Sequence, residues 1–81
     1  MIDLTDRVAV VTGGASGIGR GICLSLAGQG ADIAVADLDH RTAQSVAAEL
    51  ARAGRNAMAV AIDVSDKASV SEAIGQVLDR F

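Results

Sequence analysis

Four glycines fall within the eight residues TGGASGIG, 12–19, between an apolar run and a segment with helical periodicity. A strand that enters a helix through a tight turn needs positive φ angles at one or two positions, which glycine adopts without steric cost. The first turn of that helix presents unpaired N–H groups and the positive end of the helix dipole, which together attract phosphate. The stretch therefore predicts a phosphate-binding turn.

Each glycine has an expected task in such a turn. Gly13 and Gly14 make the turn itself. Gly17 keeps the approach to the N–H groups free of a Cβ, and Gly19 lets the helix lie close on the strand. Ser16 adds a hydroxyl that could donate to a phosphate oxygen. The alternative is a structural turn without a ligand, in which the glycines serve only the backbone.

Two aspartates follow later apolar runs, where a nucleotide-binding sheet needs acceptors. Asp37 comes 18 residues after Gly19, at the position of an acid that binds both ribose hydroxyls of an adenosine. Asp63 ends the next run in the same way and could meet the adenine. The carboxyl ends of parallel strands share one edge, so phosphate, ribose and adenine contacts converge there. The alternative for Asp37 is a helix cap, a task for which Asp39 competes.

Three apolar runs about 25 residues apart are the expected strands that position these groups: VAVV at 8–11, IAVA at 33–36 and AMAVAI at 57–62. They lack polar alternation, which is typical of parallel strands buried on both faces. The spacing leaves room for a helix after each strand and predicts right-handed βαβ units. The first two helices would then cover one face of the sheet and the third would cross to the other.

The segments between the runs change to a helical period. The first expected helix carries its apolar side chains at Ile18, Ile22, Cys23 and Leu26, and Gly28 and Gly30 end it. The second spans about 41–53, with Asp39 as its N-cap and Gly54 as its stop. The third begins after Ser65 or Asp66 and has an apolar stripe at Val70, Ile74, Val77, Leu78 and Phe81.

Composition narrows the classes of function. The net charge is −3, and the seven basic residues are scattered, which argues against a nucleic-acid partner. One cysteine excludes an internal disulfide and a multi-cysteine metal site, so no metal is expected. The longest apolar run is too short to cross a membrane, and no signal segment stands at the start. We expect a cytoplasmic protein with neither a membrane nor a nucleic-acid partner.

With these motifs in the right order and spacing, the chain resembles the short-chain dehydrogenase/reductase family over essentially all of its 81 residues. TGGASGIG matches the family's TGxxxGxG loop, and the lead-in LTDRVAVVTGG, the ADL at Asp37 and the DVSD at Asp63 also fit. The resemblance implies an α/β fold: the first half of a three-layer Rossmann-type parallel sheet, β-α-β-α-β-α with strand order 3-2-1. Residues 1–81 would form the N-terminal half of an NAD(P)-binding domain.

The resemblance also implies a set of cofactor-binding residues. Main-chain groups of Ser16 and Ile18 would meet the pyrophosphate, and Asp63 with the Val64 backbone would meet the adenine. The full set is Gly13, Ser16, Gly17, Ile18, Gly19, Asp37, Leu38, Asp63 and Val64.

The residues near Asp37 favour NAD over NADP. Its carboxylate repels a 2′-phosphate, and no basic residue stands at Leu38 or Ser16, where family members that use NADP often carry one.

The family's catalytic groups are absent from this sequence. A tyrosine and lysine in YxxxK, a serine and an asparagine lie further along family chains, which are about three times as long as this one. This chain has no tyrosine, and its single lysine, Lys67, matches none of those motifs and is interpreted as a solvated charge. No catalytic residue is assigned, and we expect the 81 residues alone to be inactive.

Three hypotheses follow. The chain is the NAD-binding portion of a short-chain oxidoreductase that interconverts an alcohol and a carbonyl, or a stand-alone adenine-dinucleotide-binding module without catalysis, or a flavodoxin-like domain without a nucleotide. The first strand is left with an open edge, which predicts either a missing C-terminal half, as in a truncated or proteolysed enzyme, or self-association.

Overall fold

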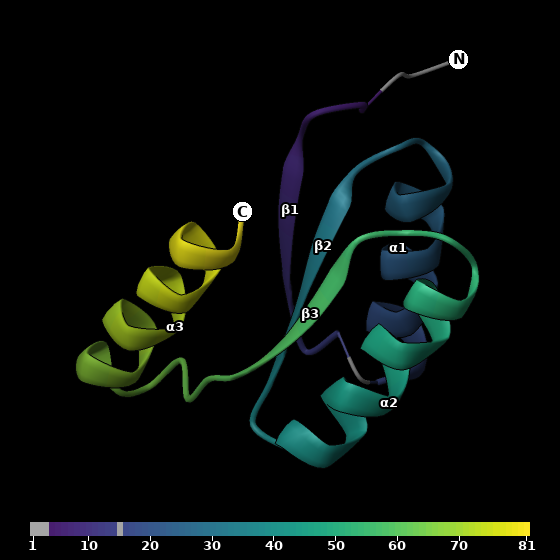
Figure 1. Ribbon diagram of the computed structural model, residues 1–81. Coiled ribbons are helices and arrows are strands. Elements are labelled where there is room, and N and C mark those ends of the chain that lie inside the picture. Colours follow the sequence, from purple (N-terminus) through teal and green to yellow (C-terminus); the bar gives the residue numbers. More distant parts are fainter. Residues whose placement is uncertain (1–3, 15) are drawn as a thin grey trace.

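The computed structural model describes residues 4–14 and 16–81 and contains three parallel strands alternating with three helices (Figure 1). The elements are β1 (Val8–Thr12), α1 (Gly17–Gly28), β2 (Asp32–Asp37), α2 (His40–Arg52), β3 (Ala57–Ala61) and α3 (Lys67–Arg80). Within this described part, no helix is long and apolar enough to cross a membrane.

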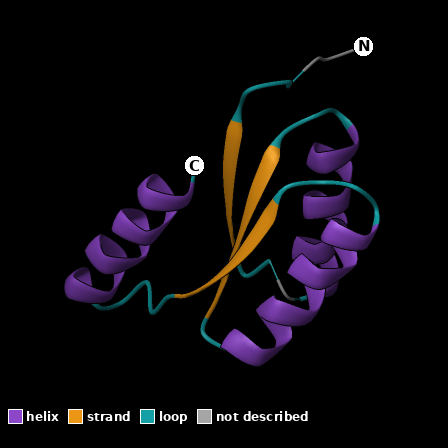
Figure 2. Cartoon of the chain, in the orientation of Figure 1, coloured by secondary structure: helices purple, strands orange, loops and turns teal. Residues whose placement is uncertain are grey.

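The sheet has the order β1-β2-β3, which is the predicted order 3-2-1 read from the other edge. Val10 lies opposite Ala34, and Val35 lies opposite Ala59. Helices α1 and α2 cover one face and α3 covers the other, so the fold has three layers (Figures 1 and 2). The predicted fold class and the predicted crossing of the third helix are confirmed.

Hydrophobic packing centres on β2, whose four middle residues are buried. Ile33 and Val35 point to the α1–α2 layer and pack with Cys23 and Leu50. Ala34 and Ala36 belong to a second, smaller cluster beneath α3. The alternation of β2 side chains between two covered faces explains why this strand is apolar throughout.

The expectation that the first run is buried on both faces is wrong for β1. Val11 is buried beneath α1, but Val8 and Val10 remain 45% and 48% exposed. They face the α3 side of the sheet, where α3 packs on β3. Among the described residues, nothing covers this half of the face.

The apolar stripe of α3 is also less buried than expected. Ala73 and Val77 are buried against the sheet, whereas Ile74 and Leu78 are 49% and 73% exposed. Successive helix residues turn by about 100°, so a helix that leans on one strand buries only a narrow part of a wide stripe.

Side-chain caps set the start of each helix. Ser16, Asp39 and Asp66 are the N-caps of α1, α2 and α3. After α1 and α2 the chain turns at Gly30 and Gly54, which have φ angles of +101° and +83°. Helix α2 begins and ends one residue earlier than expected, with Asp39 as the predicted cap.

Candidate functional site

The turn between β1 and α1 uses its first two glycines differently. Gly13 has a φ of +68°, a left-handed conformation that favours glycine. Gly14 instead is buried: a Cβ there would lie 2.8 Å from the carbonyl oxygen of Val11 and 3.0 Å from Cγ1 of Val35. Its N–H donates to the carbonyl of Ala36 at 3.2 Å, which ties the turn to β2. Gly14 therefore serves close packing, a role that the spacing did not distinguish from that of Gly13.

Gly17 and Gly19 have opposite surroundings. A Cβ on Gly19 would lie 2.0 Å from the carbonyl oxygen of Gly13 and 2.8 Å from Cα of Gly14. The close approach that requires Gly19 is thus between α1 and its own preceding turn. A Cβ on Gly17 would meet nothing within 4 Å. The absence of a side chain at Gly17 has no packing reason within the described residues.

Ser16 is an N-cap in this structure. Its Oγ accepts from the N–H of Gly19 at 3.3 Å and donates to the carbonyl of Gly13 at 2.8 Å. Its own N–H also donates to the Gly13 carbonyl, at 3.1 Å. The hydroxyl proton is therefore already engaged, and a bond to a phosphate would have to replace that contact. This capping role was not predicted from the sequence.

The start of α1 is open at Gly17, where a Cβ would meet no other atom of the described residues within 4 Å. The first N–H groups of a helix have no partner inside it. Gly19 N–H is taken by Ser16 Oγ and Arg20 N–H by the Ser16 carbonyl, which leaves those of Gly17 and Ile18 without a bond within the described residues. Ile18 is 83% exposed, so its side chain does not cover them. N–H groups at a helix N-terminus attract phosphate.

Asp37 stands beside this opening, at the end of β2. It lines an open pocket of about 240 Å³ together with Ser16, Asp39 and Thr42. One carboxylate oxygen, Oδ1, accepts from the main-chain N–H of Asp39 at 3.0 Å. The neighbouring Leu38 is 75% exposed.

Asp39, and not Asp37, caps α2. Its carboxylate accepts from Thr42 N–H at 3.2 Å and from Thr42 Oγ1 at 2.7 Å. These two bonds lower the pKa of Asp39 because they stabilise its charged form. The capping alternative considered for Asp37 is therefore taken by Asp39. Asp39 and Thr42 were missed as pocket residues, although an aspartate three residues before a threonine at a helix start was a visible signal.

Asp63 and Val64 follow β3 and form a separate part of the same sheet edge. Asp63 Oδ1 accepts from the N–H and Oγ of Ser65, at 3.0 and 2.6 Å, and these bonds lower the pKa of Asp63. The N–H of Asp63 donates to Ser69 Oγ at 2.9 Å. Val64 is exposed. Neither residue lines the pocket at Asp37, but the loops after all three strands lie at the same end of the sheet (Figure 1).

The cationic side chain next to the turn, Arg20, is held in an ion pair. Arg20, which follows Gly19 in α1, forms a two-pronged ion pair with Glu49 of α2, with a distance of 2.9 Å from Nε to Oε1. The pair raises the pKa of Arg20 and lowers that of Glu49. It also ties α1 to α2.

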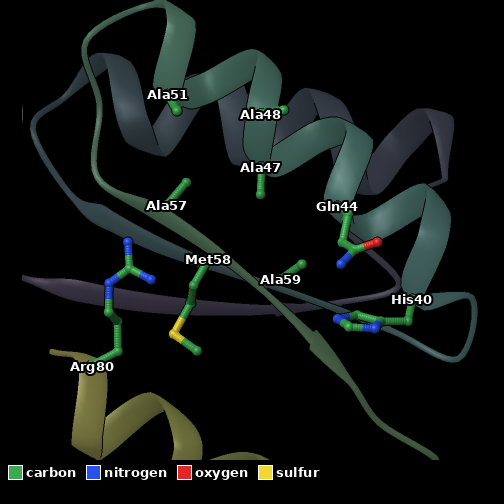
Figure 3. Close-up of a pocket in the computed structure, with 9 residues that line it drawn as sticks. All are labelled: His40, Gln44, Ala47, Ala48, Ala51, Ala57, Met58, Ala59 and Arg80. Carbon is green, nitrogen blue, oxygen red and sulfur yellow. The ribbon is translucent and has the colours of Figure 1, made fainter.

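A larger hollow of about 430 Å³ lies elsewhere, along the outer edge of β3 between α2 and α3 (Figure 3). Its wall is mostly alanine, with His40 and Gln44 toward one end and Arg80 and Met58 toward the other. It contains none of the nine predicted cofactor-binding residues. Within the described residues no group of histidine, cysteine and acidic side chains could hold a metal ion.

Comparison with known proteins identifies the family. The sequence profile of the family described as short chain dehydrogenase matches residues 7–81. The chain belongs to the short-chain dehydrogenase family. Members of this family use nicotinamide dinucleotide cofactors.

Curated relatives of this short-chain dehydrogenase chain include several dehydrogenases. It is 47% identical over 80 residues to an L-2,3-butanediol dehydrogenase of Corynebacterium glutamicum, with 94% of this chain and 30% of that protein covered. It is 38% identical over 78 residues to a sorbitol dehydrogenase of Cereibacter sphaeroides, with 96% and 29% covered. The chain thus spans about a third of the length of the curated relatives that it matches.

Solved structures show the same fold. The crystal structure of gox2181 superposes with a TM-score of 0.90 at 38% identity, over 95% of this chain and 30% of that one. A hydroxysteroid dehydrogenase from Escherichia coli gives a TM-score of 0.91 at 27% identity, over 95% and 32%.

Proposed function

We propose that this chain is the NAD-binding portion of a short-chain dehydrogenase that interconverts an alcohol and a carbonyl by hydride transfer. The observation that carries the proposal is the opening at Gly17. Gly17 has no packing constraint, and its N–H and that of Ile18 have no bond within residues 4–14 and 16–81, beside a pocket with a carboxylate. A diphosphate linked to an adenosine has the complementary chemistry, with anionic oxygens for the N–H groups and ribose hydroxyls for the carboxylate.

Each predicted cofactor-binding residue has a proposed role in this arrangement. Gly17 and Ile18 donate their N–H groups to the pyrophosphate, while Gly13, Ser16 and Gly19 build the turn that holds them. Asp37 accepts from the ribose hydroxyls, and the main chain of Leu38 lies beside it. Asp63 and the backbone of Val64 meet the adenine.

The charge around Asp37 supports NAD over NADP. The nearest side chains in its pocket are polar or acidic, and the neighbouring Leu38 carries no charge. Arg20 is engaged with Glu49. A 2′-phosphate would therefore meet a carboxylate without a free cation in the pocket lining, which disfavours the phosphorylated cofactor.

The bound cofactor would supply or accept the hydride, and this chain's residues would hold and orient it. Proton transfer to or from the substrate oxygen needs a positioned acid or base. The chain has no tyrosine, and we assign no catalytic role within its residues. The names of the relatives, a butanediol and a sorbitol dehydrogenase, favour a hydroxyl-bearing substrate.

We also infer that another polypeptide segment or a second copy covers the exposed side chains on the α3 side of the sheet. Val8 and Val10 of β1 face this side of the sheet, and Ile74 and Leu78 are exposed apolar residues of α3. The buried, unpaired thiol of Cys23 is compatible with the reducing cytoplasm, which we propose as the location.

The test is calorimetric titration of the chain with NAD, in the wild type and in Asp37→Ala and Asp32→Ala. Asp32 is a matched control because it begins the strand that Asp37 ends, so it lies at the other end of β2. Its Oδ1 accepts a hydrogen bond from Nδ2 of Asn56 at 3.2 Å. We expect Asp37→Ala to weaken binding by tenfold or more, on the order of two lost charged hydrogen bonds, and Asp32→Ala to leave it unchanged. Equal effects of the two substitutions would contradict the ribose assignment.

A further inference from the structure

We propose that Asp39 is a second determinant of cofactor specificity, which acts with Asp37 to exclude a 2′-phosphorylated dinucleotide. The inference rests on the proposed dinucleotide site. Asp37 is the residue that would bond the ribose, whereas Asp39 would act through its charge alone.

The two carboxylates line one pocket of about 240 Å³. They are also linked, because Oδ1 of Asp37 accepts from the main-chain N–H of Asp39 at 3.0 Å. A phosphate attached to a ribose that Asp37 holds would therefore enter the field of two negative charges. Ser16 and Thr42, the other side chains that line the pocket, are neutral.

The carboxylate of Asp39 is fixed in place and charged. Both of its oxygens accept hydrogen bonds from Thr42, which hold the side chain at the start of α2. The same bonds lower its pKa, so it is ionised at neutral pH. The neighbouring cation on its own helix is Arg41, which attracts the Asp39 carboxylate, and the intervening His40 is exposed. Removal of the Asp39 charge would leave Arg41 uncompensated, which would further favour a phosphate.

Asp39→Asn separates this charge from the other tasks of the residue. Asparagine is an equally good N-cap, and the main-chain N–H that bonds Asp37 is unchanged. Asp39→Ser is a second uncharged cap, in case the asparagine variant folds poorly. Asp79→Asn is the charge control. Asp79 is exposed near the end of α3, so this substitution removes the same charge outside the pocket.

The experiment is a titration of the ¹⁵N-labelled chain with ADP and with adenosine 2′,5′-bisphosphate, followed by amide NMR shifts, which detect millimolar binding. We expect Asp39→Asn to tighten binding of the bisphosphate by about three- to tenfold, the effect of removing one repulsive charge several ångströms from the 2′-phosphate in water and salt. Binding of ADP, which has no 2′-phosphate, should change by less than about twofold, and the selective gain should shrink at high salt. Asp79→Asn should not alter the ratio of the two affinities.

Two failures are distinguishable. The first is a wild type that binds ADP, with a ratio of bisphosphate to ADP affinity that is unchanged in Asp39→Asn and Asp39→Ser, or that changes as much in Asp79→Asn as in Asp39→Asn. In that case the proposed role of Asp39 is wrong and the dinucleotide site stands. If the wild type binds neither ligand, the site itself is wrong, and the inference falls with it.

Discussion

Substitution of Gly19 by alanine should cost far more stability than the same change two residues later. A Cβ at position 19 would lie 2.0 Å from the Gly13 carbonyl oxygen and 2.8 Å from Cα of Gly14. Both neighbours are backbone atoms of a turn that is bonded to β2, so no side chain can rotate away. The turn must move by more than an ångström to restore normal contact distances. That movement would also break the Ser16 cap on the Gly19 N–H.

The magnitude follows from these contacts. Overpacking of a fixed site costs about 1–3 kcal/mol, and loss of an N-cap costs about 1 kcal/mol. Alanine regains up to about 1 kcal/mol through its higher helix propensity, which leaves a net loss of about 1–3 kcal/mol. At Gly21 a Cβ meets nothing within 4 Å, so Gly21→Ala should gain about 0.5–1 kcal/mol. The two variants should differ by about 3 kcal/mol in the free energy of unfolding.

Urea denaturation followed by circular dichroism at 222 nm measures this difference. For a chain of this size the slope is roughly 1 kcal/mol per molar urea, so the midpoints of the two variants should lie roughly 3 M apart. A chain of 81 residues has a total stability of roughly 4–12 kcal/mol, so Gly19→Ala would lose a large part of it. A difference below about 1 kcal/mol would refute the close approach of α1 to its turn.

Three further outcomes are expected. Gly17→Ala should leave the urea midpoint equal or higher but abolish NAD binding in calorimetry, because its Cβ meets no protein atom and stands over the helix N–H groups; unchanged binding would contradict the open approach. The low pKa of Asp39 means that its contribution to stability is present above its ordinary pKa of 3.8 and is lost as pH falls through the folded value. The unfolding free energies of wild type and Asp39→Asn, measured between pH 6 and 2, should therefore converge on acidification, and a constant difference would argue against a lowered pKa of Asp39 in the folded state. Light scattering of the isolated chain should show association that rises with concentration and is weakened by Val10→Lys on the open face of β1, whereas a wild-type monomer at high concentration would contradict it.

The element order, the strand order and the separation of the helices over two faces could be predicted because they depend on local pattern. Apolar runs of four to six residues alternate with helical periods, and right-handed crossovers allow one arrangement. The cap of α2 was also readable, since Asp39 stands directly before the helical period. Burial of β1 and α3 was not, because it depends on which neighbour covers each surface, and Val10 or Leu78 carries no mark of that in its own sequence context.

The candidate site was predicted as a set of residues but not as a set of roles. The spacing of the glycines predicted the turn but not the reason for each glycine. In the folded structure, packing leaves no room for a Cβ at Gly14 and Gly19, whereas a Cβ at Gly17 would meet nothing within 4 Å. Ser16 was expected to contact the ligand, and the structure gives its Oγ the further task of capping α1. Such roles depend on distances between segments that a linear pattern does not contain.

The central claim is that a dinucleotide diphosphate binds to the bare N–H groups at the start of α1 while Asp37 binds its ribose. An amide NMR titration of the wild-type chain with NAD tests it most directly. The account predicts the largest shifts at Gly17 and Ile18, with further shifts at Leu38 and Asp39 beside the Asp37 carboxylate. Shifts confined to the hollow along β3, or no shift at the two α1 amides at saturating NAD, would contradict it.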